Sequence, residues 1–211
     1  MDLIIDGGPD AFATILLAHG AGAAMDSDTM TSLAAALVVA GFEVVRFEFA
    51  YMAARRTGGR KPPPRAETLL DEYRAAVAAI PSGRPLVIGG KSLGGRVASM
   101  VADEFFAAGR AKGLLCVGYP FHPPGQPEKL RTAHLAALST PALVAQGTRD
   151  PFGTPAEVGA YSLSDRIEML WLEDGDHDLK PRKTVSGFTH ADHLRTVAEA
   201  TRDWARRVIA A

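Results

Sequence analysis

The segment 85–98 constrains the fold more than any other part of the chain, because it orders a strand, a tight turn and a helix in direct succession. An apolar run with the length of a buried strand leads into the pattern Gly-x-Ser-x-Gly at 90–94, and residues with helical spacing follow. Glycines on both sides of the serine let strand and helix approach closely, and a serine at such a turn is strained with its hydroxyl directed outwards. Ser92 is therefore the candidate nucleophile.

Short apolar runs alternate with helical patterns along the rest of the chain. Besides the strand before Ser92, strands are predicted at 13–18, 42–49, 113–118, 142–146 and 167–172. Helices are predicted at 28–40, 66–79, 93–108, 128–138, 155–163 and 191–209, and 51–67 is predicted to be irregular. This alternation predicts an α/β fold: a mainly parallel sheet of about six strands, with helices on both faces, in a single domain over 1–211.

Composition excludes several classes of protein. The formal charge is -1 and 47% of the 211 residues are hydrophobic, so no excess of positive charge indicates nucleic acid. No apolar run approaches the roughly 18 residues that a membrane span needs, and no signal-peptide pattern opens the chain, so we expect a cytoplasmic protein. Cys116, the single cysteine, lies in an apolar run and is expected to be a buried structural thiol.

Four chemically active residues follow predicted strands: His19, Ser92, Asp150 and His177. Because the carboxyl ends of parallel strands meet at one edge of a sheet, these residues can converge. The order serine, acid, histidine is that of the alpha/beta-hydrolases. His177 would then be the general base, with Asp150 orienting its ring, and His19 would fix its own loop.

The oxyanion of an acyl-transfer intermediate needs fixed donors, which we expect to be the backbone N–H groups of Leu93 and Ala21. Gly20 and Gly22 remain open as the source of the second donor.

Two alternative assignments need weighing. Asp174, Asp176 and Asp178 also flank His177, but Asp150 follows a strand of its own and is preferred as the acid. His190 and His193 stand one helical turn apart, a spacing that can bind zinc, but no third ligand accompanies them. We therefore expect neither a metal nor a cofactor.

Five motifs carry a family resemblance over nearly the whole chain: LAHGAG (17–22), GGKSLGGR (89–96), GYPFHPPG (118–125), QGTRD (146–150) and DGDHDLK (174–180). With these motifs the sequence resembles the alpha/beta-hydrolase superfamily. Within it, the sequence is similar to a branch of small hydrolase-like proteins related to the testis-expressed hydrolase-like protein and the nonspecific-lethal complex regulatory subunit. The resemblance implies a Ser-Asp-His triad but no particular substrate, since some relatives serve in protein assemblies. Dienelactone hydrolases are a more distant likeness, and Ser92 stands where they have a cysteine.

The surroundings of the site suggest a small substrate. The proline-rich segment 119–128 is too short for a cap domain, so an open site is expected, with apolar walls from the residues Tyr51, Met52, Tyr119, Phe121 and Phe152. The basic loop from Arg55 to Arg65 contains no acid and is either a solvated loop or an attractor for an anionic substrate or a protein partner.

The sequence thus favours a serine hydrolase that cleaves a small soluble ester, thioester or amide through an acyl intermediate on Ser92. An acyltransferase with the same triad and a hydrolase-fold interaction module remain as alternatives. The strained serine turn favours an enzyme, because a binding protein has no need of it.

Overall fold

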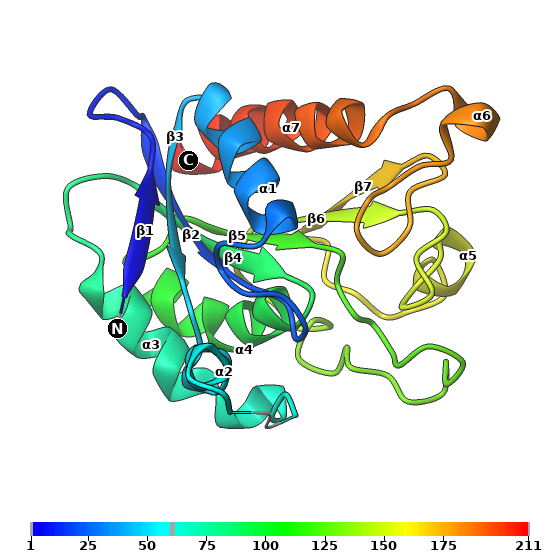
Figure 1. Ribbon diagram of the computed structural model, residues 1–211, viewed down its shortest axis with the longest axis horizontal. Helices are drawn as coiled ribbons and strands as arrows, with labels where there is room; N and C mark the ends of the chain where they lie inside the picture. The colour runs from blue at the N-terminus through cyan, green and yellow to red at the C-terminus, as the bar shows by residue number, and fades with distance from the viewer. Residues whose placement is uncertain (1, 60–61, 211) are drawn as a thin grey trace.

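The sheet at the centre of the computed structural model, which describes residues 2–59 and 62–210, has seven strands in the order β1-β3-β2-β4-β5-β6-β7 (Figure 1). Strand β1 pairs antiparallel with β3, and the other neighbours are parallel. The strands are β1 (Leu3–Asp6), β2 (Ala13–Ala18), β3 (Phe42–Phe47), β4 (Leu86–Lys91), β5 (Gly113–Val117), β6 (Ala142–Gly147) and β7 (Ile167–Leu172).

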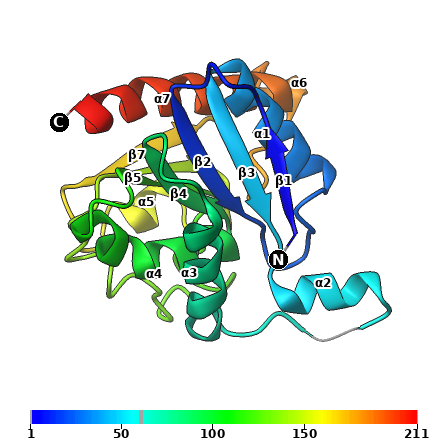
Figure 2. The ribbon, with the colours of Figure 1, turned by 90° about the vertical axis from the view of Figure 1, so that its left-hand side faces the viewer.

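Helices cover both faces of this sheet (Figures 1 and 2). They are α1 (Asp28–Val39), α2 (Ala50–Arg56), the 3-10 turn η1 (Ala66–Thr68), α3 (Leu70–Ala79), α4 (Leu93–Ala107), α5 (Pro155–Val158), α6 (Lys183–Ser186) and α7 (His190–Ala210). Helices α1 and α7 lie on one face and α3 and α4 on the other. The predicted fold class, an α/β-hydrolase fold with a mainly parallel sheet, is confirmed.

Strand β2 shows why these apolar runs are continuous rather than alternating. Leu16 packs with the side chains of α3 and α4, whereas Ile15 and Leu17 pack with those of α1 and α7. Successive side chains of a strand point to opposite faces, so a strand covered on both sides is apolar along nearly its whole length. The exception in β2 is Thr14, whose hydroxyl donates to Glu43 Oε1 at 2.9 Å. All six residues of β2 are buried.

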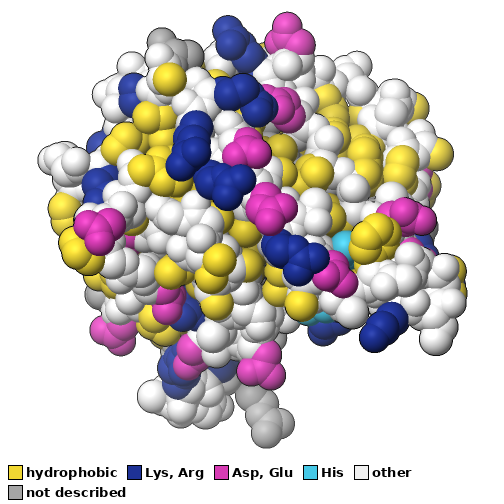
Figure 3. Space-filling model, turned by 90° about the horizontal axis from the view of Figure 1, so that it is seen from above, with side chains coloured by type: hydrophobic (Ala, Val, Ile, Leu, Met, Phe, Trp, Pro, Cys, Tyr) yellow, Lys and Arg dark blue, Asp and Glu magenta, His cyan; other side chains and the backbone are white. Residues whose placement is uncertain are grey.

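The outer surface of α7, seen in Figure 3, carries arginines interspersed with Asp and Glu. Ion pairs join Arg195 to Asp192, Arg202 to Asp203 and Arg207 to Glu168 on β7. Among the described helices, none combines the length and apolar character that crossing a bilayer requires.

Two predicted helices, at 128–138 and 155–163, are corrected by the structure. Residues 128–138 form turns instead of a helix, because the Arg131 N–H donates to the Phe121 carbonyl (2.8 Å) and the Leu135 carbonyl accepts from Ser164 N–H (3.0 Å). These links to neighbouring segments replace helical hydrogen bonds. The helix predicted at 155–163 stops as α5 at Val158, before Gly159.

The segment predicted to be irregular at 51–67 contains helix α2 and the turn η1. Long-range contacts stabilise α2: Ala50 N–H donates to the Glu72 carboxylate (2.6 Å), and Arg56 pairs with Glu48 and Asp26 (both 2.7 Å). The predicted helix 66–79 is accordingly divided into η1 and α3. Strand β1 and the short helix α6 were not predicted.

No cap domain covers the carboxyl ends of the strands in the part of the chain described. The loops after β2, β4, β6 and β7 therefore meet at an uncovered edge of the sheet.

Candidate active site

Ser92 occupies the turn between β4 and α4, with φ 50° and ψ -114°. Positive φ is unfavourable for a residue with a Cβ, at roughly 1–3 kcal/mol, and is found where the surrounding structure enforces it. The turn is enforced by close packing, since a Cβ on Gly94 would lie 2.4 Å from the Ala18 carbonyl oxygen and one on Gly90 would lie 2.5 Å from the Gly94 carbonyl carbon. Only glycine fits at these two positions.

The serine, the histidine and the aspartate selected from the sequence lie in one hydrogen-bonded chain. His177 Nε2 is 2.9 Å from Ser92 Oγ, and His177 Nδ1 is 2.8 Å from Asp150 Oδ2. Because an ionised carboxylate only accepts hydrogen bonds, Nδ1 carries the proton and donates to Asp150. Nε2 is then free to accept from the Ser92 hydroxyl.

Asp150 is completely buried and held from several sides. Its Oδ2 also accepts from Gln146 Nε2 (2.9 Å), and its Oδ1 accepts from the Phe152 N–H (2.9 Å). Gln146 is oriented in turn, because its Oε1 accepts from Tyr119 N–H at 2.7 Å. The carboxylate therefore has one defined position beneath the His177 ring.

The three aspartates that flank His177 are engaged elsewhere. Asp174 pairs with Arg182 and Arg149, and the Arg182 hydrogen bond lowers its pKa to about 2. Asp176 Oδ1 accepts from the N–H groups of two following residues at 2.9 Å, and Asp178 pairs with Lys91 at 3.3 Å. Each of these carboxylates holds the loop that carries His177.

His19 is buried and holds its own loop. Phe49 N–H donates to His19 Nε2 at 3.1 Å, so the proton is on Nδ1, which donates to the Gly20 carbonyl at 2.6 Å. Burial lowers the pKa of His19 and favours this neutral form. The Tyr51 hydroxyl also donates to this loop, at the Ala21 carbonyl (3.2 Å).

Both expected oxyanion donors border the hollow in front of the serine. Ala21 and Leu93 line it together with Ser92. Leu93 is the first residue of α4, so its N–H has no acceptor within the helix.

Lys91 is a site residue that the sequence analysis missed. Its buried ammonium donates to the His177 carbonyl at 2.8 Å and faces Asp178. Burial lowers the pKa of Lys91. Lys91 occupies the variable position before the serine in Gly-x-Ser-x-Gly, so the motif does not indicate a role for it. Its partners, His177 and Asp178, are more than 80 residues away in the sequence.

Of the five predicted wall residues, only Phe152 borders the hollows at Ser92. These hollows measure about 600 Å³ and about 350 Å³, and Phe152 lines both, with its ring centroid 4.2 Å from that of His177. The other four pack in the hydrophobic core beneath the site, a correction to the expected walls: Tyr51, Met52, Tyr119 and Phe121. Aromatic rings near strand ends bury more area in the core than at an open edge.

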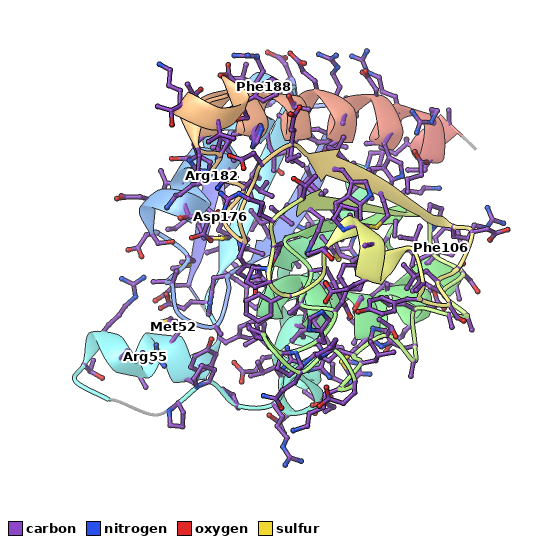
Figure 4. All side chains as sticks on the ribbon, turned by 90° about the vertical axis from the view of Figure 1, so that its right-hand side faces the viewer. Met52, Arg55, Phe106, Asp176, Arg182 and Phe188 are labelled. Carbon is purple, nitrogen blue, oxygen red and sulfur yellow. The ribbon has the colours of Figure 1, made fainter. Side chains whose placement is uncertain are left out.

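The basic segment is divided by the structure. Figure 4 shows Met52 and Arg55 on α2, apart from Asp176 in the His177 loop. Arg55 lies over the Tyr51 ring at 5.5 Å, whereas Arg65 borders the larger hollow. Arg60 and Lys61, two further basic residues of the predicted loop, lie outside the described residues.

A second serine–histidine pair lies at Ser99 and His134, with Oγ and Nε2 2.8 Å apart. The Ser99 hydroxyl donates to the Arg96 carbonyl one turn earlier in α4 (2.7 Å), so His134 is the donor in the pair. Ser99 is buried in the helix and borders neither hollow. This pair fixes α4 against the segment that carries His134.

The two histidines considered for zinc, His190 and His193, lie in the first turn of α7. His193 is buried, and its Nδ1 donates to the Leu179 carbonyl at 2.8 Å. Within residues 2–59 and 62–210, no three His, Cys, Asp or Glu side chains are grouped as a metal site would require.

The mainly parallel sheet and the serine turn at its carboxyl edge are typical of alpha/beta-hydrolases, and comparison with known families identifies the same fold. Residues 11–206 match the family described as alpha/beta hydrolase domain, so the chain belongs to that family.

Solved structures share the fold at low sequence identity. An alpha-beta serine hydrolase homologue from Coxiella burnetii is 19% identical, with a TM-score of 0.71 over 94% of this chain and 90% of that one. Dienelactone hydrolase from Anabaena variabilis is 17% identical, with a TM-score of 0.71 over 97% and 90%. The esterase domain of a Rhodothermus marinus protein is 20% identical, with a TM-score of 0.66 over 97% and 91%.

Proposed function

We propose that this protein is a serine hydrolase that cleaves a small soluble ester, thioester or amide through an acyl intermediate on Ser92. The observation that carries the proposal is the continuous hydrogen-bonded chain from buried Asp150 through His177 to Ser92, which faces an open hollow. The esterase and serine hydrolase homologue among the structural neighbours support the same class.

In the first half of the reaction, Ser92 Oγ attacks the substrate carbonyl carbon while His177 Nε2 takes the hydroxyl proton. Asp150 stabilises the resulting imidazolium. The carbonyl oxygen becomes an oxyanion that the N–H groups of Leu93 and Ala21 are placed to bind, and each such donor contributes roughly 10² to 10³ in rate. The bond to the leaving group then breaks, and His177 returns the proton to that group.

In the second half, water attacks the acyl-Ser92 carbonyl and gives its proton to His177. Collapse of this second tetrahedral intermediate releases the carboxylic acid and returns the proton to Ser92 Oγ. Because no cap domain covers the described site, a small alcohol or amine acceptor can reach the acyl group in place of water.

The test is turnover of p-nitrophenyl acetate and butyrate and of a matching thioester by the purified protein. Ser92→Ala is expected to abolish both the initial burst and steady turnover. Ser99→Ala is the matched control, because it removes the other histidine-bonded serine hydroxyl, and we expect it to retain activity. Equal turnover by the wild type and Ser92→Ala would contradict the proposal, with circular dichroism confirming that each variant is folded.

A further inference from the structure

The larger hollow at Ser92 is bordered by arginines from three separate segments of the chain. Arg65 precedes η1, Arg96 lies in the first turn of α4, and Arg131 lies in the segment between β5 and β6. One acidic residue, Glu67, borders the same hollow. Three cations and one anion leave a formal excess of two positive charges beside the nucleophile.

Glu67 neutralises one of these arginines. Its Oε1 accepts from Arg96 Nη2 at 2.6 Å, and the Arg96 positive charge in turn lowers the Glu67 pKa, although the backbone hydrogen bond of Glu67 lowers it more. Arg65 and Arg131 therefore account for the excess charge. Arg65 is exposed at the rim, while Arg131 is half-buried.

Arg131 is among the described arginines that have no counter-ion. In the stretches 2–59 and 62–210, no carboxylate lies within ion-pairing distance of its guanidinium. By contrast, Arg195, Arg202 and Arg207 on α7 are each paired with an acid. Burial and the Arg96 charge lower the pKa of Arg131, which is the consequence of a cation placed in a partly dry and positive surrounding.

The backbone of Arg131 is held in place although its guanidinium is not paired. Its N–H donates to the Phe121 carbonyl at 2.8 Å, and its carbonyl accepts from the Tyr119 hydroxyl at 3.1 Å. Both aromatic partners are fully buried. A partly desolvated guanidinium with free donors, carried by a fixed backbone, is suited to binding a planar anion through two parallel hydrogen bonds.

We propose that the hollow binds a carboxylate carried by the substrate itself, with Arg131 as its principal partner and Arg65 at the rim, so that the enzyme prefers esters or thioesters bearing a second, ionised carboxyl group. The inference rests on the proposed function. The hollow of about 600 Å³ has the size of a small-molecule site and contains Ser92 in its wall, which favours a substrate group over a macromolecule.

The test compares esters that differ only in charge. For an anion on the acyl side, the pair is p-nitrophenyl hemisuccinate and its methyl ester. For an anion on the leaving group, the pair is 4-acetoxybenzoate and its methyl ester. We expect kcat/KM for the anionic member of one pair to exceed that for the neutral member by about 10- to 100-fold, the range for a hydrogen bond to a charged group.

Variants of Arg131 and Arg202 show which arginine causes the preference for the anionic ester. Arg131→Gln should bring this ratio close to one, and Arg131→Lys, which keeps the charge but loses the paired donors, should give an intermediate ratio. Arg202→Gln removes the same charge from the α7 surface and should leave the ratio as in the wild type.

A wild-type ratio near one in both pairs, or a ratio that Arg131→Gln and Arg202→Gln change alike, would overturn the inference while turnover of the neutral esters still supports the hydrolase. Absence of turnover for all four esters would refute the proposed function and the inference together.

Discussion

Asp150→Asn removes one negative charge from the base of the site and almost nothing else. The side chain is wholly buried, and asparagine has nearly the same shape, so packing around it is retained. What changes is the support for His177, which becomes positively charged when it takes the Ser92 proton.

The structure indicates how large the loss should be. Asp150 Oδ2 accepts from two donors, Gln146 Nε2 and His177 Nδ1, while Oδ1 accepts only from the Phe152 N–H. Asparagine loses the fewest hydrogen bonds if its oxygen takes the Oδ2 position, because that oxygen still accepts from Gln146 and from His177 Nδ1. The His177 tautomer is then kept, and the asparagine NH₂ group faces only the Phe152 N–H.

The cost is then mainly the lost charge. Two unit charges about 4 Å apart at an effective dielectric of 20 interact by about 4 kcal/mol, or about 10³ in rate. A reversed tautomer would raise the loss towards about 10⁴.

The assay is kcat on p-nitrophenyl acetate, measured beside thermal unfolding to show that the variant is folded. Asp178→Asn is the matched control, because it makes the same isosteric change one residue from His177. A loss below about ten-fold in Asp150→Asn, or a larger loss in Asp178→Asn, would refute the assignment of Asp150 as the orienting acid.

Three further changes test the supports of the site. Lys91→Met should lower kcat by about ten-fold with little change in KM, because the loop that carries His177 loses its donor; unchanged kcat would contradict this. Gly94→Ala should reduce the free energy of unfolding by about 1–3 kcal/mol in urea titrations, because the new Cβ meets the backbone of β2, and an unchanged midpoint would disprove it. The pKa of Asp174 is lowered to about 2 chiefly by the Arg182 hydrogen bond, so its stabilisation is present above pH 3.8 and is lost as pH falls towards 2. Asp174→Asn should therefore destabilise the protein more at pH 6 than at pH 3, and equal effects at both would contradict it.

The fold and the three hydrogen-bonded residues Ser92, His177 and Asp150 could be predicted from the sequence, because the patterns that indicate them are local. Each follows an apolar run long enough to be a buried strand, and parallel strands bring their carboxyl ends together. The turn at Ser92 adds glycines that only a close strand-to-helix approach requires.

Elements stabilised by distant contacts could not be predicted in this way. Strand β1 has only four residues and pairs at the sheet edge, too short a stretch for an apolar pattern. Helix α2 depends on Glu48 and Glu72, which the composition of an arginine-rich segment does not indicate. The position of Arg131 beside Ser92 could not be predicted, because the helical spacing of its segment indicated a helix. In the structure the Arg131 backbone N–H is instead bound to the Phe121 carbonyl.

Covalent labelling by a fluorophosphonate probe tests the central claim most directly, because the probe reacts with a serine hydroxyl only where a base activates it. We predict that the wild-type protein is labelled at Ser92, identified by mass spectrometry of the modified peptide, and that labelling is lost in Ser92→Ala and His177→Ala. A folded wild-type protein that stays unlabelled, or one labelled at Ser99 instead, would contradict the account.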